Sequence, residues 1–517
     1  MTAPQQAQPI VGIDIGGTFT DFAVLADGVF RVHKVLSTPD DPARAVLEGM
    51  RELGIPPRQA GAVVHGSTIG TNAVLERKGA RTALVATAGF EDVLEIGRQD
   101  RPSLYDFDVT RPQPLAPREL RLGARERVDA HGTPIEPLTE AEARDVARRV
   151  LDTGAESVAV CLLFSFLNPE HERRIRQALA QAGFGPFVSL SSEVLPEYRE
   201  YERTSTTVVN AYIAPVMHRY LARLGEELGP GLRIMQSSGG SVTAEGARAR
   251  PVQTISGGPA GGVVGAFRVA RMAGHAQVIC LDMGGTSTDV SLCPGRVLET
   301  TAWELGGLPI HTPAIDVYSV GAGGGSIARI DAGGALLVGP ESAGADPGPA
   351  CYGKGDLPTV TDANFVLGRL APEYLQGLTL DRRRAEKALE PLARRMAVAV
   401  VEAAEGVVRV ANANMARAVR VISVERGHDP RDFTLVAFGG AGPLHACELA
   451  EALAIPRVLA PLYPGVLSAQ GMLFADVARE YSTTVMLRPD SIGMDLAAAD
   501  QALAGLLERG RQDMEAM

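Results

Sequence analysis

The pattern of apolar and polar positions along the chain predicts alternating short strands and amphipathic helices. Apolar runs rich in β-branched residues predict strands at residues 10–13, 22–25, 62–64, 157–166, 278–281, 290–292 and 434–438. Apolar positions at helical spacing predict helices at residues 139–153, 169–182, 381–396, 398–426 and 444–453. Thr139 and Glu142 have the spacing of a capping box, and Gly154 follows as a stop signal. This alternation predicts an α/β architecture.

One internal repeat stands out from this pattern. Residues 14–21 read DIGGTFTD and residues 282–289 read DMGGTSTD, so six of the eight positions are identical. An apolar run enters each copy and another leaves it, so each copy predicts a β-hairpin with a Gly-Gly-Thr turn. The copies are too far apart for a solenoid, and their separation indicates a duplicated structural unit.

The repeated hairpin has the chemistry of a phosphate-binding loop. Glycine lets backbone N–H groups approach a polyanion, and the threonine hydroxyls add further donors. The leading Asp14 and Asp282 end their strands, where a carboxylate can hold Mg²⁺ through water. The predicted phosphate-binding residues are Gly16, Gly17, Thr18, Thr20, Gly284, Gly285, Thr286 and Ser287. A structural turn is the alternative for either copy alone.

Further glycine clusters occur at residues 257–258, 321–325 and 439–442, and they predict tight turns where backbone approaches another group closely. Gly439, Gly440 and Gly442 lie between a predicted strand and a predicted helix, in the order strand, GGAGP, helix. Such a loop can pass beneath a base or ribose, and the following helix start offers free N–H groups. It matches neither a GxGxxG fingerprint nor a GxxxxGK[ST] loop.

Together these stretches resemble the hydantoinase A/5-oxoprolinase family, in particular its N-methylhydantoinase A-like, ATP-hydrolysing subunits. The family belongs to the actin, sugar kinase and Hsp70 superfamily of ATPases. The resemblance extends from about residue 9 to residue 481. The stretches that carry it include VGIDIGGTFTDFAVL, HGSTIGTNAVLERKGARTALVATAGFEDVLEIGRQ, SSEVLPEYREYERTSTTVVNAYIAP, MQSSGGSV, QTISGGPAGGVVGA, LDMGGTSTDVSL, DVYSVGAGGGSIARID, GADPGPACYGKG, TVTDAN and VAFGGAGPLHACELAEAL.

The resemblance implies a fold and an activity. It implies two ribonuclease H-like (actin-like ATPase) lobes with a nucleotide cleft between them. Residues 1–200 would form an N-terminal lobe, residues 201–480 an ATPase lobe, and residues 481–517 the start of a shortened or missing C-terminal region. ATP and Mg²⁺ are the implied cofactors, with Asp14 and Asp282 as the catalytic and metal-holding residues. The implied reaction is ATP-dependent ring-opening of a cyclic amide such as 5-oxoproline or a hydantoin, with a hydantoinase B-type subunit as partner in an oligomer.

Several other interpretations remain open at this point. One is the nucleotide-binding subunit of an acetone/acetophenone-type carboxylase, and another is a small-molecule kinase. A chaperone or an activator of a radical enzyme fits less well, because no peptide-binding β-domain or iron–sulfur cysteine spacing is present. Weaker site candidates are the segments His65–Thr68 and Thr71–Asn72, and Asp316 with the glycines at 321–325. His311 and His445 are expected to support other site residues or to pack, and Arg382–Arg384 to form a solvated helix face.

Composition and charge exclude some partners. The chain has 517 residues and a net charge of −11, and it lacks the basic stripe that nucleic-acid binding needs. No apolar stretch is long enough to span a bilayer, and the N-terminus does not read as a signal peptide. The five cysteines are scattered, which favours buried, reduced thiols. We therefore expect a cytoplasmic protein without nucleic-acid or membrane partners.

Overall fold

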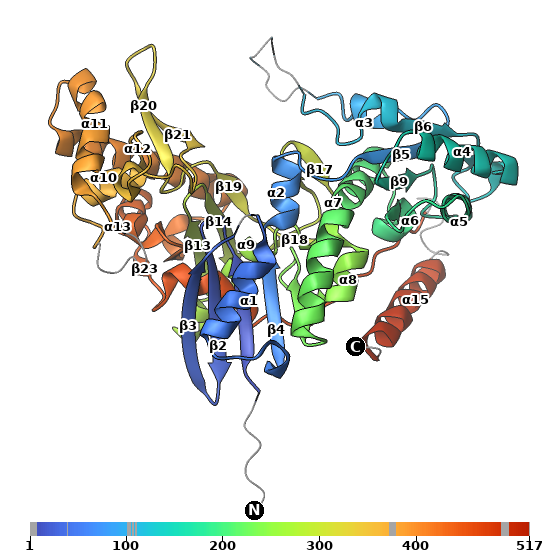
Figure 1. Ribbon diagram of the computed structural model, residues 1–517, viewed down its shortest axis with the longest axis horizontal. Helices are drawn as coiled ribbons and strands as arrows, with labels where there is room; N and C mark the ends of the chain where they lie inside the picture. Colours follow the sequence, from blue (N-terminus) through green and yellow to red (C-terminus); the bar gives the residue numbers. More distant parts are fainter. Residues whose placement is uncertain are drawn as a thin grey trace, which may run out of the picture. The chain divides into compact units, whose positions relative to one another are not determined.

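The computed structural model describes residues 8–38, 40–100, 105, 108, 111–371, 379–486 and 496–515. The chain is a mixed α/β protein that divides into two compact units (Figure 1). Unit 1 combines residues 1–66, 257–299 and 315–475, and unit 2 combines residues 67–256, 300–314 and 476–517. Each unit therefore draws on distant parts of the sequence. The division into lobes at residues 200 and 480 stays a prediction.

Two groups of neighbouring strands form the frame of unit 1. The first has the order β4-β1-β2-β3, and the second is a five-stranded sheet with the order β19-β14-β13-β22-β23. The strands of the first are β1 (Ile10–Ile15), β2 (Phe19–Ala26), β3 (Val29–Leu36) and β4 (Ala62–Ser67). Those of the second are β13 (Gln277–Met283), β14 (Thr288–Pro294), β19 (Tyr318–Val320), β22 (Thr434–Phe438) and β23 (Arg457–Leu459). Each group carries one of the repeated motifs on an antiparallel hairpin.

Helices α9 (Gly257–Met272) and α14 (Leu467–Met472) pack closely against each other. Helix α14 also packs against β1, and helix α9 also packs against β13. Glycines make this possible. A Cβ at Gly261 would lie 2.9 Å from the carbonyl oxygen of Ser468, and one at Gly265 would lie 2.8 Å from that of Leu467. The prediction of a turn at residues 257–258 is therefore wrong. Gly257 and Gly258 begin a helix, and it is Gly261 and Gly265 further along that remove side chains from the contact with α14.

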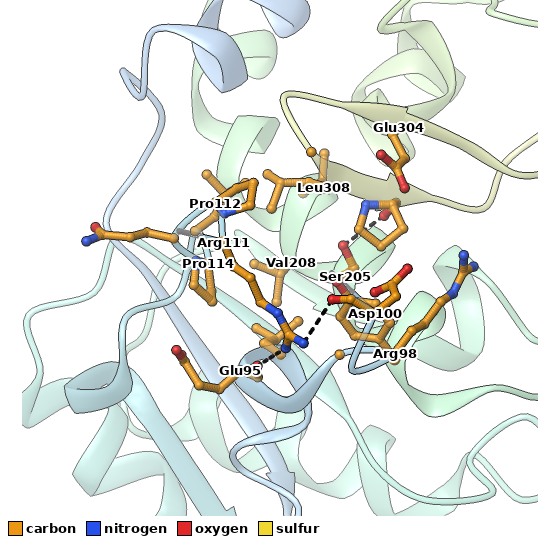
Figure 2. Close-up of a pocket in the computed structure, with 18 residues that line it drawn as sticks. Glu95, Arg98, Asp100, Arg111, Pro112, Pro114, Ser205, Val208, Glu304 and Leu308 are labelled. Carbon is orange, nitrogen blue, oxygen red and sulfur yellow. Dashed lines mark hydrogen bonds between the residues drawn. The ribbon is translucent and has the colours of Figure 1, made fainter. Parts of the chain in front are cut away.

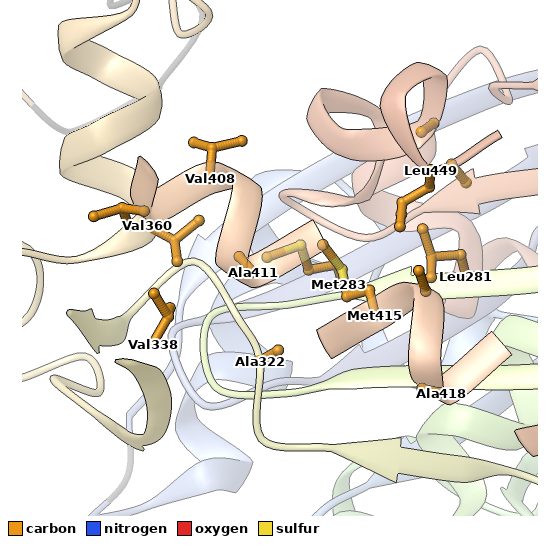
Figure 3. Packing of buried hydrophobic residues seen from close by; sticks show 14 of the residues in the cluster. Leu281, Met283, Ala322, Val338, Val360, Val408, Ala411, Met415, Ala418 and Leu449 are labelled. Carbon is orange, nitrogen blue, oxygen red and sulfur yellow. The ribbon is translucent and has the colours of Figure 1, made fainter. Parts of the chain in front are cut away.

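The other face of the five-stranded sheet carries an extensive apolar core. The helices that contribute to it are α10 (Val360–Val366), α11 (Arg382–Met396), α12 (Val400–Ile422) and α13 (Gly442–Leu453). Leu281 and Met283 of β13 point into this core with Met415 of α12 and Leu449 of α13 (Figure 3). The strand that carries Asp282 is thus held by apolar packing on its neighbouring positions. Unit 1 also contains helix α1 (Pro42–Glu52) and the hairpin of β20 (Ser326–Ile330) and β21 (Leu336–Ser342).

Unit 2 is built around a parallel sheet with the order β10-β9-β5-β6. Its strands are β5 (Thr82–Thr87), β6 (Arg121–Ala124), β9 (Ser157–Cys161) and β10 (Val188–Leu190). Short strand pairs are β7 (Arg127–Val128) with β8 (Pro134–Glu136), β11 (Leu232–Met235) with β12 (Ser241–Thr243), and β16 (Trp303–Leu305) with β17 (Leu308–Ile310). Its helices are α2 (Ile69–Leu75), α3 (Val93–Ile96), α4 (Glu140–Asp152), α5 (Glu170–Gln181), α6 (Ser191–Val194), α7 (Glu200–Leu228), α8 (Ala244–Ala249) and α15 (Leu496–Glu515).

Most predicted elements are confirmed at their predicted places. Thr139 caps α4 by accepting a hydrogen bond from the Glu142 N–H, and Asp381 caps α11 in the same way. The strand predicted over 157–166 ends at Cys161, because turns begin there. Four cysteines are buried and free, whereas Cys447 is exposed, contrary to the expectation. None of the described helices is long and apolar enough to cross a membrane.

Candidate nucleotide site

The two repeated motifs adopt the same local geometry. In the first hairpin Asp14 lies directly opposite Asp21, and in the second Asp282 lies opposite Asp289. The turns are closed by equivalent backbone hydrogen bonds, from Gly16 N to the Phe19 oxygen at 2.9 Å and from Gly284 N to the Ser287 oxygen at 3.1 Å. Each hairpin thus presents two carboxyl groups below a glycine turn.

Sequence reasoning missed the second carboxylate of each pair. Asp21 and Asp289 occupy the eighth position of the repeated motif, so the repeat itself was the signal that could have found them. Asp21 forms an ion pair with Lys34 of β3, and Asp289 accepts a hydrogen bond from the Ser319 hydroxyl of β19. Both are held by a neighbouring strand, which suits them to a supporting role beside Asp14 and Asp282.

The four carboxyl groups share one electrostatic environment. Burial raises the pKa of Asp14 to about 7, the charge of Asp21 adds to this rise, and Lys34 opposes it. Burial also raises the pKa of Asp282 well above its usual range, and Asp289, Asp14 and Asp21 add to it. Because Asp14 and Asp21 act on Asp282, the two hairpins place their carboxyl groups close enough to repel one another. A cation between them would relieve this repulsion.

Asp14 also has an unsatisfied oxygen. Its Oδ1 is buried and has no hydrogen-bond partner among the described residues. A Cβ at Gly258, in the first turn of α9, would lie 2.9 Å from this oxygen, and one at Gly66 would lie 3.3 Å from it. Larger side chains at these two positions would crowd the carboxyl group. An orphaned buried carboxylate oxygen needs an explanation, and a hydrated metal ion is one that fits oxygen donors.

The turns leave room for a ligand above them. A Cβ at Gly17 or Gly285 would meet no atom within 4 Å, and neither residue has a positive φ, so the local fold does not require glycine at either position. Both glycines and Thr286 are exposed, and Thr18 and Ser287 are partly exposed. Thr20 differs: it is fully buried, and its Oγ1 lies 3.1 Å from Ser37 Oγ. Thr20 thus lies away from the accessible side of the turn.

The third glycine loop runs beside the second hairpin. Ala441 N donates to the Met283 oxygen at 2.9 Å, and a Cβ at Gly442 would lie 3.3 Å from the Leu281 oxygen. Gly439 has φ of +78° and lies against the Asp282 carboxyl group, so this glycine is required by the turn and by the close approach. Gly440 differs, because it has no positive φ and a Cβ there would meet no atom within 4 Å. The positive φ of this loop thus lies at Gly439 and not at Gly440.

We therefore expect Gly440→Val to fold normally and to weaken nucleotide binding at least about tenfold, a loss of about 1.4 kcal/mol. The branched side chain would project into open space, where the predicted loop passes beneath the adenosine. Gly185→Val is a matched control, since Gly185 is also exposed, unstrained and uncrowded but lies in unit 2. Equal ATP dissociation constants for the two variants, measured by calorimetry, would remove this loop from the nucleotide site.

The weaker candidates have other surroundings. His65 is buried in β4 with Nδ1 3.2 Å from the Ile13 oxygen, and burial lowers its pKa to about 4. His445 is buried between Asn364 and Asn412, which agrees with its expected packing role. Asp316 forms an ion pair with Arg426.

The glycine-rich loop at 321–325 lies against the second hairpin. Gly324 N donates to the Gly284 oxygen at 3.0 Å, and Gly325 N donates to the Gly285 oxygen. This loop therefore supports the turn that carries Thr286.

Two arginines of the predicted solvated face donate to backbone carbonyls, Arg382 to Val366 and Arg384 to Ala350.

The described part of the chain contains no group of three or more His, Cys, Asp or Glu residues that could hold a metal ion by themselves. A metal at the hairpins would therefore depend on water and ligand oxygens in addition to the aspartates. Mg²⁺ is commonly held in this way, by one or two carboxylates together with phosphate oxygens. The donor set at the hairpins thus fits Mg²⁺ bound to a nucleotide and does not fit an ion caged by protein side chains.

Comparison with known proteins identifies the family. The sequence family described as hydantoinase/oxoprolinase matches residues 203–481, and the hydantoinase/oxoprolinase N-terminal region matches residues 10–183. The chain belongs to the hydantoinase/oxoprolinase family. The family resemblance inferred from the repeated motifs is thereby confirmed.

Several relatives within this family carry names that state an activity. The chain is 40% identical to the caprolactamase subunit alpha of Pseudomonas jessenii, covering 98% of this chain and 75% of that protein. It is 35% identical to the acetophenone carboxylase gamma subunit of Aromatoleum aromaticum, covering 99% of this chain and 74% of that protein. It is also 35% identical to 5-oxoprolinase 1 of Arabidopsis thaliana, where it spans 90% of this chain but only 41% of that protein.

Two solved structures share this fold. The ATP-dependent caprolactamase from Pseudomonas jessenii matches with a TM-score of 0.85 and 39% identity, over 98% of this chain and 76% of that one. The nucleotide-free acetone carboxylase matches with a TM-score of 0.82 and 30% identity, over 99% of this chain and 77% of that one. The fold of this chain is therefore that of the ATP-dependent caprolactamase and acetone carboxylase chains.

Proposed function

We propose that this chain is the ATP-hydrolysing subunit of an enzyme that opens a cyclic amide. The observation that carries the proposal is the pair of matching hairpins, whose partly buried aspartates repel one another below two accessible glycine turns. The turns would bind the phosphates through their backbone N–H groups and through Thr18, Thr286 and Ser287. The 439–442 loop would hold the adenosine. Two actin-like lobes around this nucleotide, as the sequence predicts, belong to the same proposal.

The chemistry that such a site supplies suits an unreactive ring. A lactam carbonyl is resonance-stabilised and its leaving nitrogen is basic, so water attacks it slowly. Transfer of the γ-phosphoryl group forms a bond from the amide oxygen to phosphorus and breaks the bond from phosphorus to ADP. Water can then attack the activated carbon, the ring C–N bond breaks as the nitrogen takes a proton, and hydrolysis of the resulting acyl phosphate releases phosphate. Phosphoryl transfer requires mainly positioning and charge neutralisation from the protein.

The aspartates would do most of this positioning. When bound, Mg²⁺ neutralises charge that develops on the transferring phosphoryl group. Asp14 and Asp282 would orient the ion, directly or through water, and its charge would keep both carboxyl groups ionised despite their burial. Asp21 and Asp289 would hold the ends of the hairpins in place through Lys34 and Ser319.

A carboxylase subunit is the second candidate, because one relative is named as an acetophenone carboxylase gamma subunit and one matching structure is an acetone carboxylase. Both reactions can begin with phosphorylation of an organic oxygen, so the nucleotide site alone does not separate them. A small-molecule kinase is a weaker third candidate. The words "subunit alpha" and "gamma subunit" in the relatives' names support a partner, which we propose to be a hydantoinase B-type subunit in a cytoplasmic oligomer.

Melting the purified chain with and without Mg²⁺-ATP tests the proposal. A ligand that binds only the native state adds RT ln(1 + [L]/Kd) to the free energy of unfolding, about 2.7 kcal/mol at a concentration of 100 Kd. We expect a rise of several degrees in melting temperature that requires both Mg²⁺ and ATP. No rise at millimolar Mg²⁺-ATP, in a sample that melts cooperatively, would contradict a nucleotide site at the hairpins.

A further inference from the structure

Unit 2 contains a cavity of about 230 Å³ that the nucleotide site does not use. Three parts of the chain enclose it: residues 94–100 together with 111–115, one face of α7, and the β16–β17 hairpin (Figure 2). The first two contain stretches singled out in the sequence, GFEDVLEIGRQ and EYERTSTTVVNAY, to which the nucleotide site assigns no role. The lining residues are Leu94, Glu95, Gly97, Arg98, Asp100, Arg111–Leu115, Tyr201, Ser205, Val208, Val209, Glu304 and Gly307–Pro309.

The size and the lining of the cavity suit one small ring. Its volume is below the roughly 300–1,000 Å³ of pockets that hold drug-sized ligands. Val208, Leu308 and Pro114 supply apolar surface, while Arg98, Asp100 and Glu304 supply charged groups (Figure 2). An apolar wall with a few polar groups is the usual composition of a small-molecule site.

The two guanidinium groups of the cavity are already engaged. Arg98 bonds to Glu202 Oε1 through Nε at 2.7 Å and through Nη2 at 2.6 Å. Arg111 donates to backbone oxygens, to Ile96 at 2.9 Å and to Asp100 at 3.1 Å. Glu95 pairs with Arg121, which lies outside the lining. The charge of Arg98 is therefore balanced by Glu202, which leaves its Nη1 donors unused by the described residues, and Arg111 is held by backbone oxygens.

Two carboxylates of the lining have no ion-pair partner among the described residues. Asp100 and Glu304 are exposed, and a positive charge that acts on both is that of Arg98, which is itself bound to Glu202. Tyr201 reports the charges around it. Burial raises the pKa of Tyr201, and the positive charge of Arg98 opposes this rise. The negative charges of Glu202, Glu304 and Asp100 add to the rise, so all four charges act on this point of the cavity. A ligand that carries its own carboxylate would be repelled there, whereas a ligand N–H group would find acceptors.

We propose that this cavity binds the cyclic amide, and that it selects uncharged rings over rings that carry a carboxylate. The ring N–H would donate to Asp100 or Glu304. The ring carbonyl would accept from Arg98, whose five N–H donors are only partly used by Glu202. The methylene groups would contact Val208 and Leu308. This inference rests on the proposed function, because it takes a cyclic amide as the substrate.

Binding of four probes to the full chain tests the inference: ε-caprolactam, hydantoin, 5-oxoproline and acetophenone, titrated at pH 8 and low ionic strength. We expect ε-caprolactam and hydantoin to bind at least about tenfold more tightly than 5-oxoproline. Acetophenone should bind more weakly than the lactams, because it lacks an N–H donor. Equal or tighter binding of 5-oxoproline, or tightest binding of acetophenone, would overturn the proposal.

Charge variants locate the selectivity. Asp100→Asn/Glu304→Gln should improve 5-oxoproline binding relative to ε-caprolactam about three- to fivefold, since two exposed negative charges are removed. Glu136→Gln/Asp152→Asn removes two charges from exposed positions of unit 2 outside the cavity and should leave the ratio unchanged. Val208→Trp, which fills the cavity, should abolish lactam binding. An unchanged ratio in the Asp100/Glu304 variant would overturn the proposal even if Val208→Trp fails to fold.

Mg²⁺-ATP melting of the same samples separates this inference from the proposed function. Stabilisation by Mg²⁺-ATP without any lactam binding would overturn the cavity assignment and leave the nucleotide site intact. Neither stabilisation nor lactam binding would overturn both.

Discussion

Replacing Asp14 or Asp282 with asparagine is expected to lower ATP turnover at least about 100-fold. Loss of a metal-orienting carboxylate removes charge neutralisation in the transition state, an effect often worth several kcal/mol. Asparagine has nearly the same shape as aspartate, so the hairpin should keep its geometry. Steady-state phosphate release measures the loss. Asp27→Asn is a control in the exposed turn between β2 and β3, and wild-type turnover by either site variant would show that this aspartate is not part of the site.

The same variants should not lose stability, which separates a catalytic role from a structural one. Because burial raises the pKa of Asp14 from 3.8 to about 7, the folded state binds more protons than the unfolded state between these values. The free energy of unfolding therefore falls as the pH rises toward 7. Asp14→Asn removes this dependence, so without Mg²⁺ the variant should gain stability relative to the wild type between pH 5 and pH 8. A variant that melts lower at pH 8 would indicate a structural role.

The second large effect concerns ring-opening, which we expect to need a hydantoinase B-type partner. The hairpins supply carboxylates and phosphate donors, whereas the described residues contain no metal-holding group of three or more ligands and the sequence has no known nucleophile motif. An activated amide must also be shielded from bulk water during transfer. The purified chain should hydrolyse ATP slowly and form ring-opened product far below about 1 s⁻¹, the low end for enzymes.

Adding the B-type subunit should restore product formation and couple it to phosphate release. Chromatographic measurement of the ring-opened product, with and without the partner, gives the result directly. The Asp282→Asn chain with the same partner is the control, because it should form a complex without turnover. Ring-opening by the 517-residue chain alone at about 1 s⁻¹ or faster would contradict the partner requirement.

Local sequence signals predicted the parts of the site that depend on local geometry. The Gly-Gly-Thr turns and the strand that leads to Gly439 are set by apolar runs and turn residues close in sequence. Helix α9 was missed because its glycines lower helix propensity, and only α14, some 200 residues later, explains why they are there. Long-range packing of this kind leaves no periodic signal in the helix itself.

The supporting residues of the site show the same limit. Asp21 and Asp289 could have been found from the repeat, but their partners Lys34 and Ser319 depend on which strand lies next to each hairpin. The cavity of unit 2 depends on three segments that are far apart in sequence, including the β16–β17 hairpin, so no single stretch predicts it. Tertiary pairing, and not composition, decides these contacts.

In the proposed function, ATP hydrolysis at the hairpins activates a cyclic amide. The most direct test of this coupling measures phosphate release and ring-opened product together, for this chain with a B-type subunit, Mg²⁺-ATP and ε-caprolactam. We predict that the lactam stimulates phosphate release and that one phosphate appears for each ring opened. Phosphate release that is unaffected by cyclic amides, but is stimulated by acetophenone with bicarbonate, would contradict the claim and identify the chain as a carboxylase subunit.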